Sequence, residues 1–201
     1  MRARTFTESG RRAQIVASAI GVIAEVGYAN ASFSRIAKHA GLSSTGMISY
    51  HFAGKDDLYA ACVTEIEQVT GAYMNPRIDA ADGHVGKLRA YVESNVALVG
   101  EHPAEVRALI DMVKNAGSQS AAVNGRLAVF EEHFRTGQEA GDFRPFDTRT
   151  VALALTGGLD AVVATAAAAA MTDSTELARL GRELADLYVR ATAADPEGVS
   201  E

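Results

Sequence analysis

The sequence predicts an all-α protein of about nine helices. Apolar residues recur at steps of three and four nearly throughout its 201 residues, whereas strict alternation over the length of a strand is hard to find. Only four prolines interrupt the chain, so long helices can form. We expect an N-terminal three-helix head over residues 1–54, a larger helical body over residues 55–194, and a flexible tail over residues 195–201.

Three amphipathic helices are predicted in the head. Each has an apolar face, and the first two end at a glycine, which is the residue most suited to close a helix. Asn30 or Ser32 is suited to cap the second helix, because a short polar side chain there can accept free backbone N–H groups. The three helices are predicted over residues 9–26, ended by Gly27; up to residue 40, ended by Gly41; and over about 45–51, after a turn.

A fourth, longer helix is predicted to begin at Lys55 and to end before Pro76. Its residues 55–74 connect the head to the body. Five further helices are predicted in the body, where glycines end helices and Pro103 begins one. Their apolar rows lie at residues 88–99, ended by Gly100; 106–113, ended by Gly117; 123–134, ended by Gly141; from about 147 onwards; and 177–187.

An alanine-rich segment, residues 151–171, is long enough to span a bilayer. Nine of its 21 residues are alanine, the pair Gly157-Gly158 interrupts it, and Asp160 lies at its centre. We therefore predict a buried helix of a soluble protein, with no membrane partner. The first 12 residues are polar and contain no apolar stretch, which favours a cytoplasmic location.

Charge is distributed unevenly along the chain. The net charge of −6 at pH 7 argues by itself against nucleic-acid binding. However, residues 1–60 hold seven basic and four acidic groups, whereas the remaining residues hold 12 and 21. A basic end on an acidic body suits a protein that touches a polyanion at that end only. An enzyme can also have such a distribution by chance.

The second and third predicted helices have the dimensions of a helix-turn-helix unit, whose second helix lies in the major groove of DNA. A helix that enters a groove about 12 Å wide cannot carry a thick apolar coat. We expect Ile48 and Phe52 to lie beneath this helix, and Met47 to take either role. The candidate DNA-binding residues on its outer face are short or hydrogen-bonding: Ser44, Thr45, Gly46, Met47, Ser49, Tyr50 and His51.

Three residues outside that helix complete the candidate DNA-binding set. Lys55 at a helix start is unfavourable for the helix dipole unless an anion faces it, which favours a phosphate contact over a solvated side chain. Arg11 is one of four arginines near the N-terminus that suit a basic arm along phosphates, although a solubilising tail is as good a reading for Arg2 and Arg4. Ser32 precedes the second helix. For His51, a hydrogen bond inside the head is as plausible as a contact with DNA.

About the first 60 residues resemble the TetR family of bacterial transcriptional regulators. The motifs that carry the resemblance stand at fixed spacings: Gly27-Tyr28, Ser32, Ile36-Ala37, Ala40-Gly41-Leu42-Ser43, Gly46, Ile48, His51-Phe52 and Lys55-Asp56-Asp57-Leu58. Two departures occur. The turn between Gly41 and Gly46 holds one residue more than the usual pattern, and Ser49 stands where the family commonly has tyrosine.

The resemblance implies a one-component regulator whose body binds a small molecule and forms dimers. In such proteins the last two long helices, here within residues 147–193, pair with those of a second subunit. It thus implies a homodimeric repressor that binds a pseudo-palindromic double-stranded DNA operator and is released by an unknown small-molecule effector. The stretch from Gly141 to Asp147 also resembles the loop that precedes this helix pair.

Candidate residues in the body are less specific than those in the head. Two glycines in one helix cost about 1 kcal/mol each, a cost that close packing against another helix offsets. The candidate dimer interface is Gly157, Gly158, Val162, Leu184 and Leu187. The candidate effector pocket takes residues that place a polar or polarisable atom on an apolar helical face: Tyr91, Asn95, Met112, Phe130, His133 and Phe134.

Catalytic, metal and cofactor sites are not predicted. The single cysteine, Cys62, lies on an apolar helical row and reads as a core thiol. No histidine pair has metal-binding spacing, no nucleophile turn is found, and no glycine loop suits a phosphate. We predict no enzyme and no cofactor. Two alternatives stay open: a helical ligand-binding dimer without operator recognition, and an α-helical enzyme with a basic end.

Overall fold

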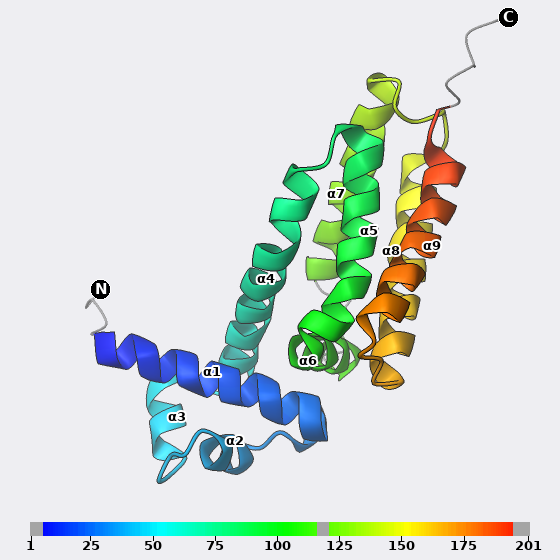
Figure 1. Cartoon of the computed structure of the whole chain (residues 1–201). Coiled ribbons are helices and arrows are strands. Elements are labelled where there is room, and N and C mark those ends of the chain that lie inside the picture. Colours follow the sequence, from blue (N-terminus) through cyan, green and yellow to red (C-terminus); the bar gives the residue numbers. More distant parts are fainter. Residues whose placement is uncertain (1–5, 116–120, 195–201) are drawn as a thin grey trace, which may run out of the picture. The chain divides into compact units, whose positions relative to one another are not determined.

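The computed structural model describes residues 6–115 and 121–194, which fold into helices joined by short turns (Figure 1). Within these ranges there is no strand, only an isolated bridge between Phe143 and Ala193. The prediction of an all-α fold with nine helices is confirmed for this part of the chain; the expected tail, residues 195–201, and Gly117 lie outside it. The elements are α1 Phe6–Val26, a 3-10 turn η1 Tyr28–Asn30, α2 Phe33–His39, α3 Gly46–His51, α4 Lys55–Asp79, α5 Gly83–Glu101, α6 Pro103–Asn115, α7 Ala121–Glu139, α8 Thr148–Ala168 and α9 Ser174–Thr192.

The chain divides into two compact units. Unit 1 comprises residues 1–70 and 102–117, and unit 2 comprises residues 71–101 and 118–201. The expected head therefore lies in unit 1, but the first part of α4 and the whole of α6 belong to the same unit. The sequence predicted a body that starts at Lys55 and includes α6. Helix α6 packs on α1 instead, and no local sequence pattern indicates that contact.

Unit 1 is held by a core to which α1, α2, α3, α4 and α6 all contribute. Its fully buried side chains include Ile15, Ile36, Ile48, Leu58 and Ile66, and α6 adds Ala108 and Met112. Cys62 lies in the same core, as predicted, and burial raises the pKa of its thiol to about 12. A thiol that stays protonated and enclosed is a packing group.

Unit 2 is a bundle of α5, α7, α8 and α9, in which α5 lies along α9 and α7 along α8 (Figure 1). Glycines mark close approaches. A Cβ at Gly100 would lie 2.9 Å from Cδ1 of Leu177, and a Cβ at Gly181 would lie 3.3 Å from the backbone of Glu93. The prediction that Gly100 ends its helix is wrong, because α5 continues through it to Glu101. The glycine makes room for α9 instead.

The fourth helix is longer than predicted. It runs to Asp79 with Pro76 inside it, so the predicted end before Pro76 is wrong. A proline inside a helix removes one backbone hydrogen bond. Here the helix continues past it, with Ala80 N–H donating to the carbonyl of Pro76 at 3.2 Å, and Met74 on the same helix is buried. The packing of α4 outweighs the cost of the backbone hydrogen bond lost at Pro76.

Helix α8 is the alanine-rich segment, and among the described residues it alone is long and apolar enough to cross a membrane, with a mean hydropathy of 1.7. Core helices of soluble proteins meet the same criterion. Only 33% of that stretch is buried within this chain, so the predicted buried helix is only partly covered by its own subunit. The two glycines of the pair face different surroundings. A Cβ at Gly158 would lie 2.4 Å from the hydroxyl of Tyr188 on α9, whereas a Cβ at Gly157 would meet nothing within 4 Å.

Gly137→Ala on α7 is expected to lower the free energy of unfolding by about 1–3 kcal/mol, as overpacking does. Its Cβ would lie 2.3 Å from the ring of Phe143, which is buried and cannot move aside, and 3.1 Å from Cβ of His84. Thermal or urea unfolding measures the change. Gly125→Ala on the same helix meets nothing within 4 Å and should raise stability by up to about 1 kcal/mol. Equal effects of the two substitutions would contradict this packing.

Candidate nucleic-acid interface

Helix α3 has only six residues and depends on two buried side chains. Ile48 is completely buried, and Phe52, directly after the helix, is 2% exposed. Thr45 precedes the helix without a side-chain capping bond, so the capping residues contribute little to its stability. The outer face of α3 consequently takes no part in the core of unit 1.

Most of the predicted DNA-binding residues share one exposed surface, which we call the α3 surface: Ser44, Thr45, Gly46, Met47, Ser49 and Tyr50, all exposed. Met47, whose role the sequence left open, is 43% exposed and lies on this surface. Tyr50 is 70% exposed, and its hydroxyl donates to Glu8 on α1 at 3.2 Å. His51 is half-buried, with its ring edge-on to that of Tyr50.

The turn between α2 and α3 accommodates the extra residue without disturbing the core. Gly41 adopts a φ of +65°, which side chains rarely adopt, and Leu42 N–H donates to the carbonyl of Ala37 at 2.8 Å. From residue 43 to Thr45 the turn is exposed. The turn that holds the additional residue is thus exposed, and Ile48 after it is buried in the core.

Two of the remaining candidates have structural partners of their own. Ser32 is exposed, and its hydroxyl accepts from the backbone N–H of Arg35 at 3.3 Å, which makes it the cap of α2 in preference to Asn30. Arg11 is half-buried on α1 and donates to Gln14 at 2.6 Å. Gln14 in turn donates to the carbonyl of Ala40 at the end of α2.

Lys55 is half-buried at the first position of α4. Its Nζ donates to the carbonyl of Tyr28 at 3.4 Å and lies 5.1 Å from the ring centre of Tyr28 and 5.2 Å from that of Tyr59. Cation–π contacts of this kind hold an ammonium group in place. An ammonium group has three donors, and one such bond leaves two for another acceptor.

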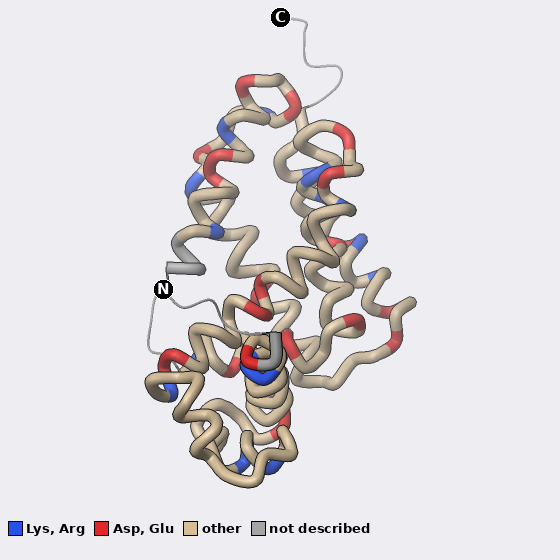
Figure 2. Tube along the Cα trace, turned by 90° about the vertical axis from the view of Figure 1, so that its left-hand side faces the viewer, with Lys and Arg blue, Asp and Glu red and all other residues tan. Residues whose placement is uncertain are grey.

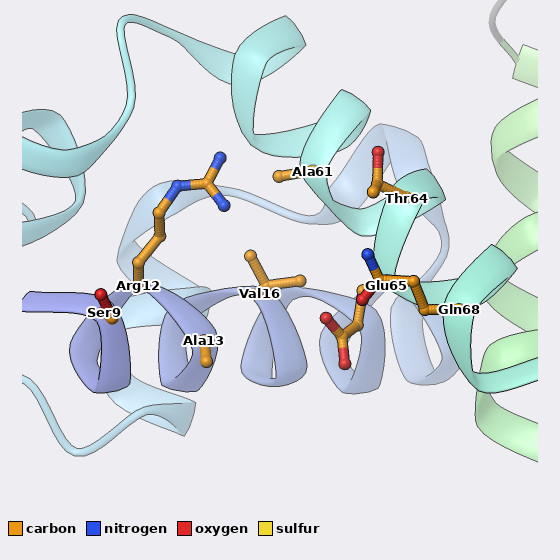
Figure 3. Close-up of a pocket in the computed structure, with 8 residues that line it drawn as sticks. All are labelled: Ser9, Arg12, Ala13, Val16, Ala61, Thr64, Glu65 and Gln68. Atoms are coloured by element: carbon orange, nitrogen blue, oxygen red, sulfur yellow. The ribbon is translucent and has the colours of Figure 1, made fainter. Parts of the chain in front are cut away.

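A hollow of about 330 Å³ lies between α1 and α4 within unit 1 (Figure 3). Arg12 reaches across it from α1, and its guanidinium lies 4.7 Å from the ring centre of Phe52. Its Nε is buried without a hydrogen-bond partner. The side chains that line the hollow are Ser9, Arg12, Ala13, Val16, Ala61, Thr64, Glu65 and Gln68. Arg12 thus serves as packing for the end of α3.

Basic and acidic residues are interleaved along the helices of both units (Figure 2). Residues 1–60 therefore hold more basic than acidic groups, but the two kinds of charge do not form separate surfaces. Arg35 and Lys38 are exposed on α2, next to the α3 surface in the sequence. Such a surface suits contact with phosphates at one end of the chain.

The predicted pocket residues do not all come together. Tyr91, Asn95, Phe130, His133 and Phe134 lie in unit 2, whereas Met112 lies in the core of unit 1. The rings of Tyr91 and Phe130 meet edge to face at 4.7 Å, and those of Phe130 and Phe134 lie 6.2 Å apart. Asn95 donates to Sδ of Met74 at 3.7 Å.

Arg126 is a polar residue of this region that the sequence analysis missed. It lies four residues before Phe130 and so on the same face of α7, a spacing that would have singled it out. Arg126 donates to Asp160 on α8 at 2.5 Å, and its Nε is buried without a partner. Burial raises the pKa of Tyr91, while the positive charge of Arg126 opposes that shift.

The candidate dimer residues lie on α8 and α9. Gly157 is exposed and Leu187 is 61% exposed, whereas Val162 and Leu184 are half-buried and Gly158 packs on Tyr188 of the same chain. The structure adds Leu153, which is 52% exposed on α8. Leu153 precedes Gly157 by four residues, so the two share a face.

His133, His84 and Asp142 are joined by hydrogen bonds. Nδ1 of His84 lies 2.7 Å from Oδ2 of Asp142, and Nε2 of His133 lies 3.0 Å from the carbonyl of His84. The hydrogen bonds from His84 lower the pKa of Asp142. Burial lowers the pKa of His133, which outweighs the opposite effect of its hydrogen bond to His84.

Stability is expected to fall as the pH is lowered from 7.5 to 5.5. The pKa of His133 is lower in the folded protein than its ordinary 6.5, so the unfolded chain binds the proton more readily and acid favours unfolding. His133→Gln removes that proton site and should flatten the dependence, measured as melting temperature against pH. His39→Gln, on an exposed residue of α2, is the control. An unchanged slope in His133→Gln would rule out this source.

A short exposed helix over a shared core, preceded by a turn and a second short helix, defines the helix-turn-helix class of transcription regulators. In agreement, residues 15–62 match the family model of bacterial regulatory proteins of the tetR family. The HTH-type transcriptional regulator BetI of Stenotrophomonas maltophilia is 38% identical over 89 residues, which cover 44% of this chain and 45% of BetI. The match thus spans less than half the length of this relative.

Solved structures extend the likeness to the whole fold. SmeT, the repressor of the Stenotrophomonas maltophilia multidrug efflux pump SmeDEF, superposes with a TM-score of 0.75, 23% identity, and coverage of 94% of this chain and 96% of SmeT. The transcriptional regulator FadR from Bacillus subtilis, in complex with stearoyl-CoA, superposes with a TM-score of 0.71 and 22% identity. The superposition covers 88% of this chain and 97% of FadR. At these identities the likeness shows the fold alone.

The likeness to the TetR family is thus one of sequence in residues 15–62 and of fold alone over the rest of the chain. The resemblance found in its motifs is confirmed. Its relatives are named as transcriptional regulators, which agrees with the prediction that it is not an enzyme.

Proposed function

We propose that this protein is a repressor that binds a pseudo-palindromic operator as a homodimer and is released from it by a small molecule in the cytoplasm. The observation that carries the proposal is the α3 surface, where small residues, Met47 and Tyr50 are exposed above the buried Ile48. These side chains fit the major groove, and their donors and acceptors match base edges. The family places the heads of a dimer in successive major grooves.

Titration against DNA tests the proposal. The full chain is titrated with its own upstream DNA and with unrelated DNA of equal length, at several salt concentrations, followed by selection from genomic fragments. A site bound at least about 10³-fold more tightly than unrelated DNA supports a sequence-reading regulator. Weak, sequence-independent binding with no fragment enriched favours a ligand-binding dimer without operator recognition instead.

Lys55→Ala is expected to weaken binding to all DNA sequences alike and to reduce the slope of log affinity against log salt by about one, because one phosphate contact is lost. Lys55→Arg keeps the charge and should retain most of the slope. Lys87→Ala, on an exposed lysine of α5, is the matched control and should change nothing. A normal slope in a folded Lys55→Ala protein would exclude the phosphate contact.

The proposed dimer uses the outer face of α8 and α9. Leu153 on α8 and Leu187 on α9 are large exposed apolar side chains, and Gly157, four residues after Leu153, has no side chain to hold a partner helix away. Burial of such a face against a second copy gains apolar area without any change within the subunit. A two-fold axis would apply the same contacts to both copies.

Leu153→Glu is expected to shift the protein from dimer to monomer, because it places a charge in the proposed interface. Sedimentation or light scattering at micromolar concentration measures the shift. Val129→Glu introduces the same charge at another exposed apolar position, on α7, and should leave the oligomeric state unchanged. Dimers of normal affinity in Leu153→Glu would place the interface elsewhere.

The proposed effector site lies in unit 2, around Tyr91, Asn95, Phe130 and Arg126. Its aromatic pair offers apolar contact, and the amide and guanidinium supply polar groups that fix a ligand's orientation. Release follows by linkage, because a ligand that prefers the conformation poorly suited to DNA lowers operator affinity by the same factor by which DNA lowers ligand affinity.

A further inference from the structure

The turn that joins α1 to the helix-turn-helix unit is a meeting point of hydrogen bonds from several helices. The carbonyl of Tyr28 accepts from Lys55 of α4, at 3.4 Å, and the carbonyl of Ala31 accepts from the hydroxyl of Tyr59, also of α4, at 3.0 Å. The carbonyl of Asn30 accepts from Arg35 of α2 at 3.3 Å. These contacts tie the turn to the helices that carry Lys55 and Ser32.

The N-terminal side of the same turn is held from α6. The backbone N–H of Tyr28 donates to Oδ2 of Asp111, a residue 83 positions further along the chain. Gly27, which precedes the 3-10 turn, has no side chain to cap it and adopts a φ of +81°. A Cβ at Gly27 would lie 3.3 Å from Oδ2 of Asp111. Because Gly27 has no side chain, the carboxylate of Asp111 can accept the Tyr28 N–H that a capping side chain would otherwise accept.

Helix α6 is firmly seated for this role. It packs along α1 and against the turn, and Ala108 and Met112, one turn before and one residue after Asp111, are buried in the core of unit 1. A hydrogen bond to an ionised acceptor is stronger than one between neutral groups. Asp111 thus joins a packed helix to Tyr28, the residue whose carbonyl accepts the hydrogen bond from Lys55.

We propose that Asp111 is a positioning residue for DNA binding, which fixes the turn Tyr28–Asn30 and, through it, the placement of α2 and Lys55. Asp111 itself touches no DNA in this scheme. A displacement of α6 would act on the head through this contact. The inference rests on the proposed operator binding, but the contact itself is measurable without DNA.

The test compares two acceptor-lacking variants with one that keeps the acceptor. Asp111→Ala removes the acceptor, and Asp111→Ser is too short to reach the N–H of Tyr28. Asp111→Asn retains a carbonyl oxygen at that place. Met112→Val, one residue further along α6, disturbs the core without offering or removing a polar partner. For each variant, operator and non-specific affinities are measured at a temperature where circular dichroism shows folded protein, together with hydrogen exchange at the Tyr28 amide.

Asp111→Ala and Asp111→Ser are expected to weaken operator binding on the order of tenfold, the value of a lost hydrogen bond, and to weaken non-specific binding to a smaller extent, because Lys55 contacts the phosphates of any sequence. The Tyr28 amide should exchange at least about tenfold faster in both. Asp111→Asn should stay within about threefold of the wild type, and Met112→Val should lose thermal stability while its operator affinity is retained.

Normal operator affinity in both acceptor-lacking variants would overturn the proposal. An equal loss in Met112→Val would also overturn it, because the effect would then be one of general stability. If the wild type forms no specific complex, the proposed function fails; slow exchange of the Tyr28 amide that depends on Asp111 would still support the contact, and rapid exchange in the wild type would refute it.

Discussion

A helix of six residues has no stability of its own in water, because nucleation of a helical turn fixes many dihedral angles for few hydrogen bonds. Helix α3 exists because Ile48 and Phe52 are buried in the core of unit 1. That single constraint separates the two sides of the helix. The inner side is apolar and enclosed, and the outer side carries exposed residues that take no part in the core.

The core beneath α3 is assembled from distant parts of the chain. Helices α1 and α2 and the first part of α4 come from the first 70 residues, whereas α6 returns more than 30 residues later to add Ala108, Met112 and the carboxylate of Asp111. The head is thus larger than a three-helix unit. A segment from outside the DNA-binding motif is part of the structure that holds the motif in place.

Several polar residues serve structure and proposed function together. Lys55 binds the carbonyl of Tyr28 and still has two donors for a phosphate. Ser32 caps α2 and is exposed on the side of the turn. Arg126 compensates the charge of Asp160 while its Nε remains buried without a partner.

Much of the head was predictable from the sequence, because its signals are local. The apolar spacing placed α1, α2 and α3, Gly27 and Gly41 marked helix ends through their positive φ, and the motifs around Ile48 and Lys55 carried the family. Side chains at three- and four-residue spacing share a face regardless of the rest of the fold. The same argument placed the α3 surface outward.

Tertiary packing decided what no local pattern contains. Pro76 stays inside α4, Gly100 makes room for Leu177 instead of ending α5, and Met112 belongs to the core of unit 1 and not with the other pocket candidates. Arg126 and Asp111 gain their importance from partners 34 and 83 residues away. The sequence by itself determined the helices and the exposed face of α3, because periodicity and capping act over a few residues. Only the tertiary structure decided the partners of each helix, because those depend on contacts between segments far apart in the chain.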